Sequence, residues 1–101
     1  MDSRLVNVGF GNAVTVSRIL AVVHPGSSPI RKLKEDARSE KKLIDVTEGR
    51  RTRAIIVLDS GHLVLSSVQP ETISQRLLTL NQDQRNPSSL LEKVKNEEQD
   101  G

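Results

Sequence analysis

Three arginines within four residues are the strongest chemical feature of this sequence. Arg50, Arg51 and Arg53 lead directly into the apolar run at residues 54–58. Positive charges held this close repel one another, and a guanidinium group presents N–H donors in a fork that fits phosphate oxygens. A cluster of this kind at the entrance to a strand therefore favours an anionic partner.

A second interpretation of the same arginines is a solvated loop. In this interpretation the nearby carboxylates of Asp45 and Glu48 pair with the guanidinium groups, and exposed pairs of this type are worth only ~0–1 kcal/mol. In an extended chain Arg51 and Arg53 would point to one side and Arg50 to the other. The residues alone leave both interpretations open.

The other residues with reactive side chains do not predict catalysis. Asp59, Ser60 and His62 are the residue types of a nucleophilic triad, but one short turn cannot hold them in the stacked geometry of a triad. The sequence Gly9–Gly11 starts like a dinucleotide fingerprint, but Val14 stands where the third glycine belongs, so a turn is expected. The chain has no cysteine and two histidines. We therefore expect no enzyme activity, cofactor, metal site or small-molecule substrate.

Composition and charge limit the class of protein. The chain has 101 residues, of which 35% are apolar, with one aromatic residue, so a single small core of Leu, Ile and Val is expected. Residues 1–80 contain twelve Lys and Arg against eight Asp and Glu, whereas residues 81–101 contain three against five. We expect a basic domain over 1–80 and a polar, acidic, mostly disordered tail over 81–101. A single aromatic residue disfavours base stacking as a binding mode, and hence single-stranded nucleic acid.

Neither a membrane span nor a signal peptide is expected. No apolar run reaches the length of a transmembrane helix, and the N-terminus lacks a charged start followed by an apolar block. These observations predict a cytoplasmic protein.

The apolar pattern predicts an α+β fold, with a small antiparallel sheet and two short helices. The first helix is expected to start with Ser28 as N-cap and Pro29 as first helical residue, and to present Ile30, Leu33 and Ala37 on one face.

The second helix is expected to start at Pro70, with Ile73, Leu77 and Leu80 on one face. Two β-prone runs around a glycine-containing turn predict a hairpin. The expected strands are residues 5–8, 19–23, 43–46, 54–58 and 63–68.

Residues 54–58 form a strand that is apolar on both faces. Two short helices can cover one face of a sheet, so the other face requires a further cover. A second copy of the chain is the simplest cover, and we therefore expect a homo-oligomer.

Four stretches together resemble the RemA family of bacterial extracellular matrix regulatory proteins. They are Asn7–Asn12, Pro29–Arg31, Gly49–Ala54 and Ser66–Ile73, and the resemblance covers roughly residues 4–78. It implies a protomer related to LytTR-type DNA-binding domains, homo-oligomeric rings that bind double-stranded DNA on a basic face, and activation of transcription, in some bacteria of biofilm matrix genes.

The resemblance also implies which residues act. The DNA-binding arginines of the family correspond to Arg18, Arg50 and Arg51, with Arg53 as a neighbouring candidate, and Pro29 corresponds to a position tied to function. The resulting hypothesis is a nucleoid-associated, DNA-binding transcriptional regulator that acts as a homo-oligomer.

Two alternatives stay open from the residues. One is an RNA-binding, β-rich ring, against which the lack of stacking aromatic residues counts. The other is a structural interaction protein whose arginines pair with acidic segments, including its own tail.

Overall fold

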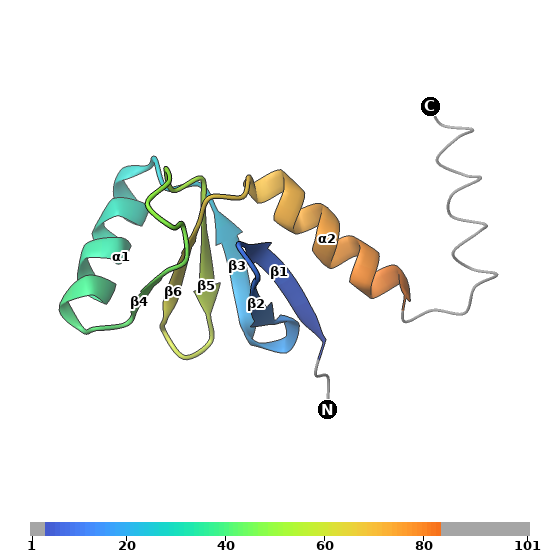
Figure 1. The fold of residues 1–101 in the computed structure, drawn as a ribbon. Coiled ribbons are helices and arrows are strands. Elements are labelled where there is room, and N and C mark those ends of the chain that lie inside the picture. The colour runs from blue at the N-terminus through green and yellow to red at the C-terminus, as the bar shows by residue number, and fades with distance from the viewer. Residues whose placement is uncertain (1–3, 84–101) are drawn as a thin grey trace.

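The computed structural model describes residues 4–83 of the chain and has two helices and two sheets (Figure 1). A two-stranded sheet pairs β1 with β2, and a four-stranded sheet has the strand order β3-β5-β6-β4. This arrangement confirms the small α+β fold. The elements are β1 Leu5–Gly9, β2 Asn12–Thr15, a 3-10 turn at Val16–Arg18, β3 Ile19–Val23, α1 Ser28–Ser39, β4 Leu43–Asp45, β5 Ala54–Leu58, β6 Leu63–Ser66 and α2 Pro70–Asp83.

The four-stranded sheet is mixed, so the prediction of an antiparallel sheet is correct for β3, β5 and β6 and wrong for β4. β5 lies antiparallel to β3 and β6, whereas β4 lies parallel to β6, with Leu43 opposite Leu63. The physical reason is the path of α1. This helix carries the chain from the end of β3 back to the end of the sheet where β6 begins, so β4 starts beside the start of β6.

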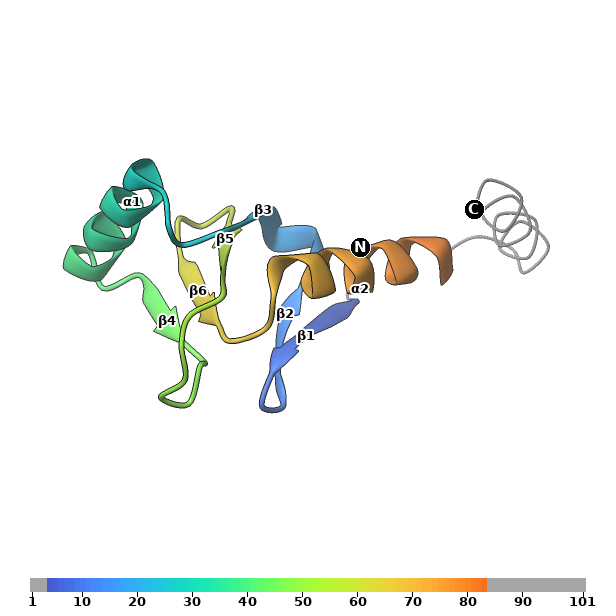
Figure 2. The same cartoon turned by 90° about the horizontal axis from the view of Figure 1, so that it is seen from above.

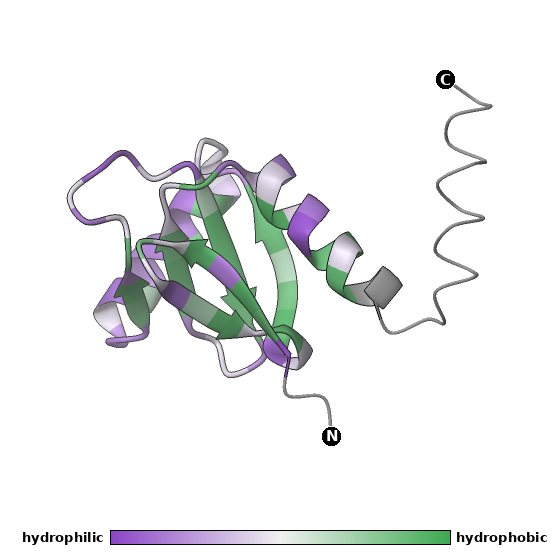
Figure 3. Cartoon of the chain, turned by 45° about the vertical axis from the view of Figure 1, so that its right-hand side comes forward, coloured by the Kyte–Doolittle hydropathy of each residue, from purple (hydrophilic) through white to green (hydrophobic). Residues whose placement is uncertain are grey.

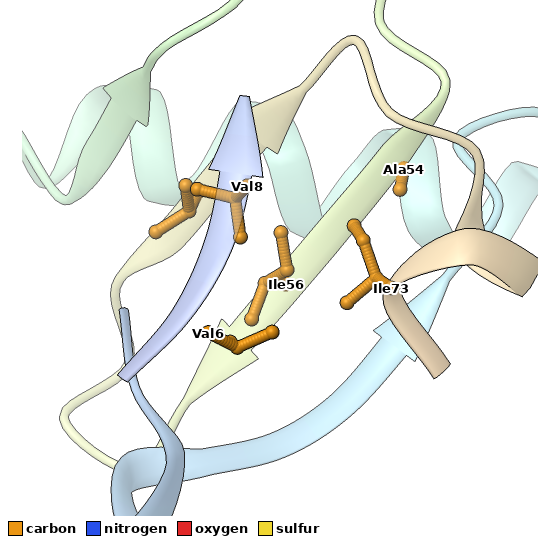
Figure 4. Close-up of a cluster of buried hydrophobic side chains, with 6 residues drawn as sticks. Val6, Val8, Ala54, Ile56 and Ile73 are labelled. Atoms are coloured by element: carbon orange, nitrogen blue, oxygen red, sulfur yellow. The ribbon is translucent and has the colours of Figure 1, made fainter. Parts of the chain in front are cut away.

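The central strand β5 is buried on both faces by the chain itself. Ala54 and Ile56 belong to a core with β1 and α2, whereas Ile55 belongs to a second core with α1 and β6. All three side chains have 0% exposure. Figure 4 shows the first of these cores, and Figure 3 shows the strands as mainly hydrophobic and the loops as mainly hydrophilic.

This double burial corrects the argument that β5 needs a second copy of the chain. The sequence predicted only the two helices as covers for the sheet. In the structure the β1–β2 hairpin and α2 together cover one face of β5, and α1 covers the other. The apolar character of β5 is therefore explained within one protomer and does not itself indicate an oligomer.

Helix α1 begins close to the predicted position. Its N-cap is Ser27 rather than Ser28, and Pro29 lies in the first turn, where a missing N–H leaves no hydrogen bond unmade. Ala37 is buried, but Leu33 of the predicted apolar face is 40% exposed. The helix therefore rests on the sheet through a narrow contact around Ile30 and Ala37.

Helix α2 begins at Pro70 as predicted and continues to Asp83, three residues beyond the expected domain boundary at residue 80. Ile73 is buried, and Leu77 and Leu80 pack against the same core. The remaining tail lies outside the described residues. Within residues 4–83, neither helix has the length and apolar character needed to cross a membrane.

The core position of Ile56 gives a first prediction. Ile56→Ala removes a fully buried side chain between β1, β6 and α2 and should destabilise the fold by about 2–5 kcal/mol in urea unfolding. Leu33→Ala, at a side chain of α1 that is 40% exposed, should cost less than about 1 kcal/mol. Equal losses in the two variants would show that β5 is not the centre of the core.

Candidate functional site

The loop between β4 and β5 gathers the three arginines around one hollow. Arg50, Arg51, Arg53 and Ser67 line this space, which has a volume of about 390 Å³. We call it the arginine hollow. All three arginine side chains are exposed to solvent. The cluster therefore presents its positive charge at one place on the surface.

The loop turns immediately before the three arginines. Glu48 and Gly49 have φ angles of 54° and 78°, in the left-handed region. The N–H of Arg50 donates to the carbonyl oxygen of Thr47 at 3.0 Å, which closes a turn. After this turn, Arg50 lines the same hollow as Arg51 and Arg53.

The base of the loop is fixed by hydrogen bonds. The hydroxyl and the N–H of Thr47 both donate to Oδ1 of Asp45, at 2.7 and 2.9 Å, and Thr47 is buried. The hydroxyl bond first, and then the backbone bond, hold the pKa of the Asp45 carboxyl below its ordinary value of 3.8. At the other end of the loop, the N–H of Arg53 donates to the carbonyl oxygen of Ser66 at 2.8 Å.

The carboxylates near the hollow do not neutralise it. Asp45 is bonded to Thr47, and within residues 4–83 no carboxylate forms an ion pair with Arg50, Arg51 or Arg53. The structure therefore does not show the ion pairs of Asp45 and Glu48 with the arginines that the second interpretation expected. Within residues 4–83, the positive charge of the hollow is therefore not offset by an ion pair.

The tip of the β1–β2 hairpin lies against the same region. The Ser66 hydroxyl donates to the carbonyl oxygen of Val8 at 2.7 Å, a buried bond between β6 and β1. The guanidinium carbon of Arg50 lies over the ring of Phe10, 5.5 Å from its centroid. Figure 2 shows the hairpin tip and the β4–β5 loop projecting from the same side of the sheet.

Phe10 is the site residue that the sequence did not identify. Gly9 and Gly11 around it predicted a turn, which is confirmed, but no local pattern indicated that this turn would meet Arg50. One feature of the sequence could have identified Phe10. It is the single aromatic residue of the chain and lies in a predicted turn, outside the core.

Arg18 lies apart from the arginine hollow. It precedes β3, and Ile19 pairs with Leu58 at the end of β5, whereas Arg53 precedes the start of β5. The length of β5 thus separates them, roughly 17 Å at ~3.4 Å per residue. Nη1 of Arg18 forms an ion pair with Oδ2 of Asp59 at 3.2 Å. Within one protomer the fold does not bring Arg18 to the cluster.

The remaining residues singled out in the sequence have structural places. Pro29 is exposed in the first turn of α1. The Ser60 hydroxyl and Nδ1 of His62 are 2.7 Å apart in an exposed turn, while Asp59 faces Arg18 instead of His62. This turn is the expected one, and its three side chains do not align as a triad.

Comparison with known proteins matches the chain to one family and to several regulatory proteins. The family described as extracellular matrix regulatory protein A-like (RemA-like) matches residues 5–77, which include Arg18 and the arginine hollow. A regulatory protein of Syntrophobacter fumaroxidans is 62% identical over 79 residues, covering 78% of this chain and 84% of that protein. One of Thermodesulfovibrio yellowstonii is 60% identical over 77 residues, covering 76% and 91%. One of Cyanothece is 52% identical over 89 residues, covering 88% and 97%. All three are named as regulatory proteins.

The hydrogen bonds of Asp45 predict a pH effect on stability. Because the folded-state pKa lies below the unfolded value, the carboxylate stabilises the fold fully above about pH 4, and this contribution disappears as the pH falls through the folded-state pKa. Asp45→Asn keeps the shape and removes the charge. In urea unfolding it should be less stable than wild type near neutral pH, with a difference that shrinks below about pH 4.

Thr47→Ser is the matched control, because it keeps the hydroxyl that donates to Asp45 and should retain the pH dependence of the wild type. A stability difference between wild type and Asp45→Asn that stays constant over the acid range would refute this assignment.

Proposed function

Because the chain belongs to the extracellular matrix regulatory protein A-like family, we propose that it regulates transcription by binding double-stranded DNA as a homo-oligomer. Its relatives are named as regulatory proteins, which supports a regulatory role for this chain. The proposal concerns how it regulates: which molecule it binds, and with which residues.

The arginine hollow is the observation that carries this proposal. Three guanidinium groups share one exposed space, and no carboxylate of the described chain is paired with them. Guanidinium groups bind phosphate oxygens through parallel N–H donors, and each phosphate contact releases counterions. A phosphate backbone would supply the negative charge that residues 4–83 do not pair with these arginines.

Duplex DNA fits the site better than a single strand. Single-stranded nucleic acids are usually bound by aromatic side chains that stack on bases. The one aromatic ring of the chain, Phe10, already faces the Arg50 guanidinium. A duplex needs no stacking platform, and its regular phosphates match a repeated positive surface. The site offers no set of side chains arranged to read base edges, so sequence preference would come from DNA deformability.

A homo-oligomer would multiply a contact that is weak in one protomer. Linked copies convert the second and later contacts into intramolecular steps, which raises the overall affinity. β3 is an edge strand of its sheet, and its Leu20 is 69% exposed. Leu5 of β1 and Leu78 of α2 are also more than half exposed. An open sheet edge and exposed leucines support assembly of several copies, in a ring as the family resemblance implies.

Arg18 would extend the DNA-binding surface. One duplex, with a charge every ~1.7 Å along its axis, spans the length of β5 that separates Arg18 from the hollow. Arg53, which lines the hollow beside Arg50 and Arg51, completes the proposed DNA-binding set. Pro29 acts on the structure, as part of the start of α1. Bound to chromosomal DNA, the protein would be nucleoid-associated and would act on genes such as those of the biofilm matrix.

Substitution of the hollow arginines tests the proposal. Arg50→Ala and Arg51→Ala should each weaken binding to a long duplex and reduce the slope of log K against log salt by about 0.9 for each phosphate that is no longer bound. The oligomer, measured by light scattering, should stay intact because exposed arginines contribute little to the core. Arg38→Ala, at an exposed arginine of α1 paired with Glu35, makes the same charge change and should leave the slope unchanged.

The competing interpretations give different results in the same titration. Preference for an RNA competitor over duplex DNA would favour an RNA-binding ring. Wild-type affinity and slope in both hollow variants would show that DNA does not bind at the arginine hollow.

Arg18 gives a separate prediction because its guanidinium already forms an ion pair with the carboxylate of Asp59. Arg18→Ala should weaken duplex binding, and Asp59→Asn should strengthen it at low salt by releasing the Arg18 guanidinium for a phosphate. In the Arg18→Ala background, Asp59→Asn should have a smaller effect. An equal gain in both backgrounds would mean that Asp59 acts only through its general negative charge and that Arg18 does not contact DNA.

A further inference from the structure

Phe10 is placed where the core does not need it. It is the single aromatic residue of the chain, its side chain is 51% exposed, and it belongs to neither hydrophobic core. A large apolar ring in a solvent-exposed turn carries an unfavourable hydration free energy. This position therefore calls for an explanation other than packing.

The backbone around Phe10 is also unusual. Gly9, Phe10 and Gly11 have φ angles of 108°, 53° and 77°, and the left-handed region is unfavourable for a residue with a side chain. Two asparagines hold the turn in place. Oδ1 of Asn7 accepts from the Gly9 N–H at 2.8 Å, and Nδ2 of Asn12 donates to the Gly9 carbonyl oxygen at 3.0 Å.

The hairpin tip is fixed relative to the arginine hollow. A Cβ at Gly9 would lie 3.2 Å from Cγ2 of Val68, so the backbone approaches the chain after β6 closely. The buried bond from Ser66 to Val8 holds the same two segments together. Ser67, between these contacts, lines the hollow. The ring of Phe10 is thus held at a set position beside Arg50.

We propose that Phe10 is a positioning residue of the DNA-binding surface, which holds the Arg50 guanidinium for a phosphate at the arginine hollow. This rests on the proposed function. A guanidinium over an aromatic face is attracted by the ring quadrupole and loses part of its rotational freedom before the ligand arrives. Its N–H donors lie in the guanidinium plane and stay available to phosphate oxygens.

The proposal predicts a loss of affinity without a loss of stability. Phe10→Asn removes the ring and places at this φ angle a residue that tolerates it better, so thermal stability should be kept or raised. Binding to a long duplex should weaken by about two- to fivefold for each protomer bound, which corresponds to about 0.5–1 kcal/mol for an exposed cation–π pair. Phe10→Tyr, which keeps a ring, should retain wild-type affinity.

A double-mutant cycle with Arg50→Ala gives the decisive comparison. If Phe10 acts through Arg50, Phe10→Asn should cause no further loss of affinity in the Arg50→Ala background. The same loss in both backgrounds would overturn the positioning role, as would wild-type affinity of Phe10→Asn alone.

These outcomes separate the positioning role from the proposed function. If Arg50→Ala weakens duplex binding and Phe10→Asn does not, only the role of Phe10 is wrong. If the wild-type protein does not bind duplex DNA, the proposed function is wrong and the role of Phe10 is wrong with it.

Discussion

The burial of β5 on both faces is the constraint on which the rest of the structure depends. A strand that reads Ala-Ile-Ile-Val-Leu has no polar side, so an 80-residue body must provide two covers for it. Helix α1 supplies one cover, and the β1–β2 hairpin with α2 supplies the other. Because the hairpin packs over β5 and β6, its tip necessarily lies near the loop through which the chain enters β5. The core thus determines where the candidate site forms.

The site itself combines a rigid base with unneutralised charge. The carboxylate of Asp45, one of the two acidic groups near the arginines in sequence, accepts the hydrogen bonds of Thr47 at the base of the loop. Within residues 4–83, the three guanidinium groups are exposed to solvent and form no ion pair. Holding like charges together is unfavourable, and a polyanion relieves this repulsion on binding. The same electrostatic property would make binding depend strongly on salt.

The sequence predicted the elements whose signals are local. The turn at Gly61 between two apolar runs indicated the β5–β6 hairpin, and the spacing of Ile73, Leu77 and Leu80 indicated the inner face of α2. Local patterns could not give the contacts between distant segments. The parallel pairing of β4, the Arg18–Asp59 ion pair and the Phe10–Arg50 contact join residues 20 to 41 positions apart in the chain. These contacts depend on how the hairpin and the helices pack around β5. The periodicity of apolar residues in the sequence does not predict that packing.

The central claim is that the arginine hollow receives the phosphate backbone of duplex DNA. The most direct measurement is the arginine side-chain Nε–Hε NMR spectrum of the full chain, assigned by single substitutions, during titration with a duplex. The account predicts that the resonances of Arg50, Arg51 and Arg53 move or broaden, while that of Arg38 on α1 stays in place. Perturbation of Arg38 to the same extent, or no change at the three hollow arginines, would contradict it.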